Sequence, residues 1–291
     1  MVDTMLRQLY QDRASELDTC AILLLENEGE KTSITDGFNA VVLIIKEDTA
    51  IQWDIKHYVI DNRTVALHIL DKELMHYSLI VGSNRRLVDW LVSGKIVYDR
   101  NEFLANVKER IETFPLDDRA KKMTIQFTKM LRRFEEGKTL FAQGHFFDAY
   151  SNMMHALHHL ARLAVIRQGF YPEITVWEQV RQIEPETYKL YQELLKSEET
   201  LEKRIELMVL ATEFAIHSKT IEGSQHFIDC IRLEKREWSI SELMALSEVE
   251  DYKIDLELFL NFLVEKKIMR VECKPTKANG INHLRYHINF S

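Results

Sequence analysis

The sequence of 291 residues predicts three consecutive folded parts: an α/β (α+β) domain, an all-α helical bundle and a winged helix-turn-helix. Helical and strand patterns alternate over about the first hundred residues. From residue 117 the strand patterns disappear, and apolar residues recur at helical spacing. After residue 239, short helices precede two strands, the order of a helix-turn-helix with a β-hairpin wing. We therefore expect domains at 1–117, 118–236 and 237–291.

The composition is that of a folded, helix-rich protein. Hydrophobic residues make up 46% and charged residues 29%, with only 9 Gly and 4 Pro. The formal net charge of -8 argues against a protein that coats nucleic acid with its whole surface. The cysteines, Cys20, Cys230 and Cys273, lie far apart and are interpreted as reduced thiols. Without a signal sequence or an apolar run of membrane length, we expect a cytoplasmic protein with no membrane contact.

The first part is organised around residues 35–45. Asp36-Gly37 is typical of a turn, and the apolar run that follows ends at Lys46. This pattern predicts a buried central strand. The other expected elements are a helix over 4–17, strands over 21–25, 58–60, 64–70 and 96–98, a turn at Asp61-Asn62, a helix over 72–79 capped by Asp71, and a helix from Ser83 or Asn84 to Leu91, before Gly94.

The bundle is predicted from apolar residues at helical spacing and from Gly and Pro at the boundaries. One helix is expected to end at Gly137 and a second to run over 139–168. Further helices are expected over 173–183, 186–196, 199–220 and 223–237. In the last part we expect short helices over 241–246 and around Asp251, a longer helix over 256–267, and strands over 268–273 and 284–290.

The domain order, Asp36 at the head of a strand, and residues 82–91 with 94–100 together resemble the nucleotidyltransferase superfamily. The resemblance is closest to bacterial nucleotidyltransferase-like proteins with a helical substrate-binding domain and a C-terminal helix-turn-helix. It implies a Gly-Ser pair that opens a helix, two acids two residues apart on the next strand, and a third acid on a neighbouring strand. Acids at that spacing point the same way and can share Mg²⁺, which holds a triphosphate.

This sequence departs from the implied pattern. Asp36 matches the first acid, Phe38 stands at the second, and Ala66 is the counterpart of the third. One carboxylate, with Glu26 or Asp61 as helpers, is a poor site for a metal pair. We therefore predict Asp36 as a vestigial catalytic residue and weak metal ligand, with Mg²⁺ and a nucleotide as the cofactor the resemblance allows; the alternative is a turn residue.

Other polar residues are ligand-binding candidates in the first part. Glu26-Asn27 occupy the Gly-Ser position, and Asn39 follows Phe38. Arg85 and Arg86 are suited to bind a phosphate, or alternatively form a solvated helix start.

A polar stripe is predicted on the second helix of the bundle. Its members are spaced by 4, 3, 4 and 3 residues, which places them on one face: Asp148, Asn152, His155, His159 and Arg162. The opposite face, from Phe147 to Ala164, is expected to be core. The stripe is interpreted as lining a ligand pocket towards the α/β domain, as a solvated face, or as a metal site at His155 and His159.

The C-terminal part separates its charges. From Lys266 onward there are 6 basic residues and 1 acid. The nucleic-acid-binding candidates are Lys266, Lys267, Arg270, Lys274 and Lys277. Asp255 and Glu257, at the start of the expected recognition helix, oppose entry into a DNA groove. A protein contact or homodimer interface is the alternative.

Together these features predict a nucleotidyltransferase-like protein that is catalytically degenerate. We expect it to bind a nucleotide or nucleic acid in the cleft between its first two domains and to have a regulatory role. Two alternatives remain: an active nucleotidyltransferase that modifies a small molecule, RNA or protein, and a ligand-sensing DNA-binding regulator.

Overall fold

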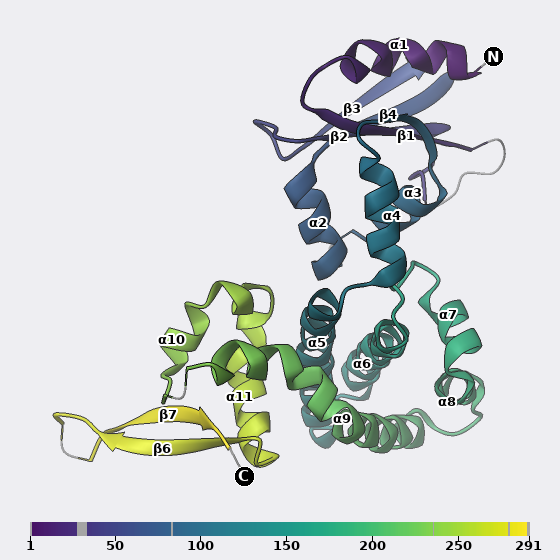
Figure 1. Cartoon of the computed structure of the whole chain (residues 1–291). Coiled ribbons are helices and arrows are strands. Elements are labelled where there is room, and N and C mark those ends of the chain that lie inside the picture. Colours follow the sequence, from purple (N-terminus) through teal and green to yellow (C-terminus); the bar gives the residue numbers. More distant parts are fainter. Residues whose placement is uncertain (1, 28–33, 83, 235, 279, 290–291) are drawn as a thin grey trace. The chain divides into compact units, whose positions relative to one another are not determined.

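The computed structural model describes residues 2–27, 34–82, 84–234, 236–278 and 280–289, and the chain divides into two compact units (Figure 1). Unit 1 comprises Met1–Pro115 and Gly169–Ile174, and unit 2 comprises Leu116–Gln168 and Thr175–Ser291. The predicted fold classes are confirmed: a mixed sheet with helices, a helical region, and short helices followed by a β-hairpin. Residues 169–174, which the sequence groups with the bundle, belong to unit 1, where Tyr171 stacks on Phe114.

Unit 1 contains a five-stranded mixed sheet with the order β3-β4-β2-β1-β5. Strands β2 and β4 are parallel, and the other neighbours are antiparallel. The predicted central strand is confirmed, because β2 is the middle strand and nearly all of it is buried. The elements are α1 (Val2–Ala14), β1 (Thr19–Glu26), β2 (Ala40–Lys46), β3 (Trp53–Ile60), β4 (Arg63–Asp71), α2 (Lys72–Val81), α3 (Arg85–Ser93), β5 (Lys95–Asp99) and α4 (Phe103–Thr113).

Both faces of this sheet are covered. Alternate residues of β2, such as Val42 and Ile44, pack with Leu6 and Tyr10 of α1 on one face. Figure 1 shows α1 on that face and α2, α3 and α4 on the other. A strand buried on both faces has no solvent-exposed face that would need polar residues, which is why β2 is a continuous apolar run in the sequence.

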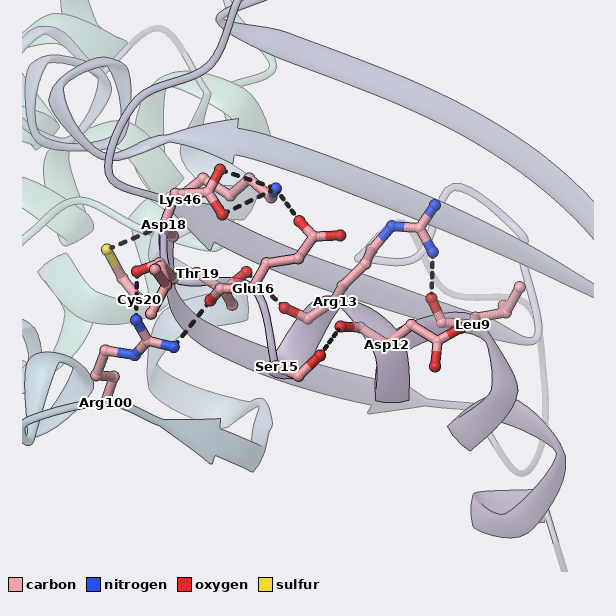
Figure 2. A network of polar contacts seen from close by, with 11 residues as sticks. Leu9, Asp12, Arg13, Ser15, Glu16, Asp18, Thr19, Cys20, Lys46 and Arg100 are labelled. Atoms are coloured by element: carbon pink, nitrogen blue, oxygen red, sulfur yellow. Dashed lines mark hydrogen bonds and ion pairs between the residues drawn. The ribbon is translucent and has the colours of Figure 1, made fainter.

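A polar network fixes the loop between α1 and β1 (Figure 2). Lys46, at the end of β2, forms ion pairs with Glu16 and Asp18. Arg100 donates hydrogen bonds to the main-chain oxygens of Glu16, at 2.8 Å, and of Leu17. These contacts tie the loop to β2 and to the residue after β5, so the network is structural and lies outside the cavity described below.

Helix caps in unit 1 follow from the sequence. The Asp71 carboxylate accepts hydrogen bonds from the main-chain nitrogens of Glu73 and Leu74, which confirms the predicted cap of α2. Asn84 caps α3 in the same way, and α3 ends before Gly94; Ser83 lies outside the described residues. Helix α4 was not predicted; its amide nitrogen at Leu104 donates to the Asp99 carboxylate at 2.9 Å.

Unit 2 is helical up to its C-terminal hairpin. Its elements are α5 (Leu116–Ala142), α6 (Phe146–Arg167), α7 (Val176–Ile183), α8 (Pro185–Lys196), α9 (Leu201–Arg232), α10 (Ile240–Met244), a 3₁₀ segment η1 (Ser247–Asp255), α11 (Leu256–Glu265), β6 (Met269–Pro275) and β7 (Asn282–Ile288). No helix among the described residues is long and apolar enough to cross a bilayer.

Two predicted helix boundaries in the bundle are wrong. Gly137 lies inside α5 and Gly223 inside α9, so each helix is longer than expected. A Cβ at Gly137 would lie 2.8 Å from Met153 Cε, and a Cβ at Gly223 would lie 2.3 Å from Phe127 Cγ. These glycines permit close packing rather than ending helices. Helix α5 ends instead just before Gly144, whose φ angle is 81°. The end of α6 agrees with the expected end at residue 168, and Gly169 beyond it has a φ angle of 87°.

Candidate functional site

Unit 1 contains a cavity of about 360 Å³ on the sheet face that carries α3. Strands β2, β3 and β4, the turn before β2, and α3 all contribute to it. Its lining is rich in aromatic and imidazole rings, and the described lining residues include a single carboxylate. The lining residues are Thr35, Asp36, Phe38, Val41, Trp53, Ile55, His57, Ala66, His68, Asn84, Arg86 and Trp90.

Strand alternation brings these rings together. Trp53, Ile55 and His57 are two residues apart on β3, so their side chains share one face of the sheet. On the neighbouring strand Ala66 pairs with His57, and His68 pairs with Ile55. This register produces a floor of small and aromatic side chains.

His68 forms the buried base of the cavity. Its Nδ1 accepts a hydrogen bond from Trp53 Nε1 at 3.1 Å, which places the ring proton on Nε2. The His68 ring lies edge-on to Trp90, with 4.8 Å between ring centroids. Burial, together with the charge of His57, lowers the pKa of His68 to about 4. His68 is therefore neutral at physiological pH and acts as a polar packing group.

Asp36 lies at the mouth of the cavity in a tight turn. The turn is closed by a hydrogen bond from the Phe38 nitrogen to the Thr35 oxygen, and both Asp36 and Gly37 have positive φ, as in a type I′ turn. The Asp36 carboxylate forms an ion pair with Arg86, whose guanidinium also lies 5.8 Å from the centroid of the Trp90 ring. The structure therefore brings together two predicted site residues, and each neutralises the other.

The cavity does not fit a metal pair. Phe38 and Ala66, at the positions where the resemblance implies acids, both line the cavity, and Phe38 packs against His57 with ring centroids 4.6 Å apart. Among the described residues there is no cluster of three or more His, Cys, Asp or Glu side chains that could hold a metal ion. Mg²⁺ needs several oxygen ligands, and Asp36, the carboxylate of the described lining, already has a cationic partner.

The other predicted residues of this site lie outside the cavity lining. Asn39 joins strand ends: its Oδ1 accepts from the Thr64 nitrogen at 2.9 Å, and its main-chain oxygen accepts from Asn27 at 2.9 Å. Glu26 is exposed at the end of β1. Arg85 begins α3, but its side chain lies outside the described residues.

The prediction from the sequence did not include four rings of the lining, namely Trp53, His57, His68 and Trp90. The available signal was the spacing of Trp53, Ile55 and His57 by two residues, which marks one face of a strand. Strand β3 begins at Trp53, five residues before the expected start at Tyr58, so Trp53, Ile55 and His57 lie outside the predicted strand.

The polar stripe of α6 is divided between solvent and α5. Asp148 and His155 are exposed. Asn152 accepts a hydrogen bond from Arg133 of α5 at 3.2 Å. His159 and Arg162 both approach the buried Gln126 of α5, with His159 Nδ1 2.9 Å from Gln126 Oε1. Phe147, expected in the core, is 84% exposed, because it lies in the first turn of α6.

The residue that connects this stripe to a second cavity is His159. That cavity, of about 450 Å³, lies among α5, α6 and η1 and is lined by Lys129, Arg132, Arg133, His159, Ile254 and Asp255. Burial, and then the nearby positive charge of Arg162, lowers the pKa of His159 to about 3. The imidazole is therefore neutral, and the positive charge of this cavity comes from α5.

The predicted recognition helix is mostly buried. On α11, Leu256, Phe259, Leu260, Phe262 and Leu263 are buried, and the Phe259 and Phe262 rings contact Phe127 of α5. Asp255 is also buried and pairs with Arg132, so it does not face a groove as expected. The exposed residues of α11 are Glu257, Asn261 and Glu265, spaced by four, which makes its outer face acidic.

The basic residues near the hairpin are in different environments. Lys267 and Arg270 line a hollow of about 360 Å³ beside β6 and β7. Lys266 lies 3.2 Å from the His217 ring. Lys274 forms ion pairs with Glu237 and Glu272, which raise its pKa, and Lys277 is exposed.

Known proteins are similar to this chain over nearly its whole length. Family models match residues 2–119 (nucleotidyltransferase-like), 120–219 (YgxA-like substrate binding domain) and 225–288 (helix-turn-helix domain). The protein YgxA of Bacillus subtilis (strain 168) is 41% identical over 285 residues, which cover 98% of this chain and 97% of YgxA. The chain belongs to the YgxA family. This finding confirms the resemblance stated from the sequence.

A solved member of the same fold supports this YgxA-family assignment. The crystal structure of a nucleotidyltransferase-like protein from Exiguobacterium sibiricum 255-15 matches with a TM-score of 0.84 and 36% identity, over 99% of both chains. The YgxA-family chain described here is thus a nucleotidyltransferase-like protein with a substrate-binding-type helical domain and a C-terminal helix-turn-helix.

Proposed function

We propose that this protein has lost metal-dependent nucleotidyl transfer and binds a nucleotide in the unit 1 cavity, with a regulatory role. The observation that carries the proposal is the pairing of Asp36 with Arg86 in a cavity that has no second acid among its described lining residues. A carboxylate neutralised by a guanidinium is a poor ligand for Mg²⁺.

The cavity has the chemistry of a nucleobase site. Base rings stack on aromatic side chains, which contributes about 1–3 kcal/mol per base. His57 and Phe38 present rings at the cavity wall, and Trp53 lies at the strand end. Arg86 is the cation of the lining, and it can exchange its contact with Asp36 for a phosphate of the ligand.

Calorimetric titration with each nucleoside triphosphate, with and without Mg²⁺, tests the proposal. We expect binding that Mg²⁺ does not strengthen. Arg86→Gln should weaken binding about tenfold, because it removes a charged hydrogen-bond donor. Asp36→Asn should leave binding unchanged or strengthen it, because Arg86 loses its internal competitor. The matched control is Arg63→Gln, an exposed arginine outside the cavity. The absence of binding for all four triphosphates would contradict the proposal.

Incubation with labelled triphosphates separates this function from an active transferase. We expect no transfer of label to protein, RNA or small molecules. Transfer that disappears in Asp36→Asn would establish the enzyme instead.

A DNA-binding output is supported only by the Lys267 and Arg270 hollow, because the exposed face of α11 is acidic and would repel phosphate. Contact through the wing predicts a salt-dependent gel shift that is lost when Lys266, Lys267 and Arg270 are replaced by Gln. A shift that survives these substitutions would contradict contact through the wing.

A further inference from the structure

The second cavity, among α5, α6 and η1, carries an excess of positive charge. Lys129, Arg132 and Arg133 occupy positions i, i+3 and i+4 of α5, so their side chains share one face of that helix. Asp255 is the only acid among the lining residues that the structure describes, and His159 is neutral. Three cations therefore face one lining carboxylate in a hollow of about 450 Å³, and Glu136, outside the lining, offsets part of the charge of Arg132 and Arg133.

The partners of these cations within the chain do not occupy all of their hydrogen-bond donors. Within the described part of the chain, Lys129 forms no ion pair or side-chain hydrogen bond, although it is only partly exposed. Arg133 contacts Glu136 and Asn152 through Nη1, each at 3.2 Å, so Nε and Nη2 remain for a ligand. Arg132 is more fully engaged, since it binds Asp255, lies 3.9 Å from the Glu136 carboxylate and donates to the Ile254 oxygen at 3.0 Å.

Charge behind the cavity adds to the positive potential. Arg162 lies at the side of His159, with Nη1 3.3 Å from His159 Nδ1. Burial, followed by the charge of Arg162, lowers the pKa of Lys129, and the carboxylates of Asp255 and Asp251 partly oppose this shift. Clustered cations repel one another, and an anion placed among them relieves both that repulsion and the desolvation of Lys129.

We infer that this cavity is a binding site for a small molecule that carries a di- or triphosphate group. Lys129 and Arg133 would bind the phosphate oxygens, and Arg132 would contribute charge while it holds η1. A polyphosphate matches three clustered cations better than a single carboxylate does. The volume is that of a small-molecule site, and Ile254 at the rim, 82% exposed, offers apolar contact to the rest of the ligand.

This site is separate from the proposed nucleotide cavity, because its residues belong to unit 2 and that cavity belongs to unit 1. It joins two of the matched domains: α5 and α6 lie within the substrate-binding-type region, whereas Ile254 and Asp255 lie in the helix-turn-helix. A ligand here would therefore contact the residues that hold η1 against α5.

The test is calorimetric titration of the full chain with inorganic tripolyphosphate, which has no base to bind the aromatic cavity. We expect wild-type binding, a loss of about tenfold or more in Lys129→Gln and in Arg133→Gln, and recovery in Lys129→Arg. Arg181→Gln is the matched control for Arg133, because Arg181 is also an exposed arginine paired with an acid three residues away. Lys138→Gln is the control for charge on α5, because Lys138 is outside the cavity. Both controls should bind as wild type does.

Three outcomes would overturn the inference. The first is no tripolyphosphate binding by the folded wild type. The second is an equal loss in the cavity and control variants, which would indicate diffuse attraction. The third is binding of a single-stranded oligonucleotide but not of tripolyphosphate, which would identify a nucleic-acid backbone site. Arg86→Gln separates this site from the proposed function: it should reduce nucleoside triphosphate binding in unit 1 and leave tripolyphosphate binding unchanged.

Discussion

Replacement of Gly223 by alanine is expected to destabilise unit 2, although alanine is the better helix former. The new Cβ would lie 2.3 Å from Cγ and 2.4 Å from Cδ2 of Phe127. Phe127 is fully buried, and its ring centroid lies 6.1 Å from that of Phe259 and 5.8 Å from that of Phe262. The ring therefore cannot move without displacing α11.

The magnitude follows from two opposing effects. Alanine in place of glycine inside a helix stabilises by about 1 kcal/mol. Overpacking of a filled core costs about 1–3 kcal/mol, and contacts this short with an aromatic ring place Gly223→Ala at the upper end. The expected net loss in the free energy of unfolding is about 2 kcal/mol, which lowers the melting temperature of a unit of this size by about 4–8 °C.

Urea and thermal unfolding followed by circular dichroism measure this change. Ser218→Ala, an exposed substitution on the same helix, is the control and should change stability by less than about 0.5 kcal/mol. Phe127→Leu combined with Gly223→Ala should show a favourable coupling of about 1 kcal/mol or more. An unfolding midpoint that rises in Gly223→Ala would refute the reasoning, because it would mean that α9 and α5 are not in such close contact.

The remaining predictions concern caps, packing and pH. Gly137→Ala should change the free energy of unfolding by less than about 1 kcal/mol. The new Cβ would lie closest to the flexible end of Met153, and alanine has the higher helix propensity. A loss as large as that of Gly223→Ala in the same unfolding experiments would contradict this prediction. Asp71→Ala should destabilise unit 1 by about 1–2 kcal/mol in denaturant unfolding, because two main-chain nitrogens lose their hydrogen-bond acceptor. An unchanged unfolding midpoint would show that the cap is dispensable. His68 binds its proton near pH 6.5 when unfolded and near pH 4 when folded, so the unfolded state holds more protons between these values and stability falls as the pH is lowered through this window. The loss in the free energy of unfolding reaches about 3 kcal/mol. The free energy of unfolding of His68→Gln should therefore depend less on pH between pH 7 and pH 4 than that of the wild type. Parallel pH profiles of the two proteins would contradict this role of His68.

Local sequence patterns predicted much of the fold. The apolar run of β2 could be placed because a strand buried on both faces needs apolar residues at every position. Asp71 could be identified as a cap because a short acidic side chain before a helical pattern has a local partner in the next turn. Both predictions depend on residues that are neighbours in the chain.

The site was predicted only in part. Asp36 could be located from its turn, and the family resemblance implies that Phe38 and Ala66 stand where the family has acids; all three line the cavity. The pairing of Asp36 with Arg86 could not be predicted, because it joins a turn to a helix 50 residues later. The cationic cavity also required packing of α5 against η1, which brings Lys129 near Asp255 across more than a hundred residues.

The sequence alone therefore determined the order of fold classes and the central strand, since both depend on residue type and local periodicity. Only the tertiary structure decided that Gly137 and Gly223 lie inside helices, that Arg86 neutralises Asp36, and that the basic face of α5 borders a cavity. The physical reason is that a glycine or a charge has the same local pattern whether it meets solvent or another helix. Its role is set by the partner that folding places beside it.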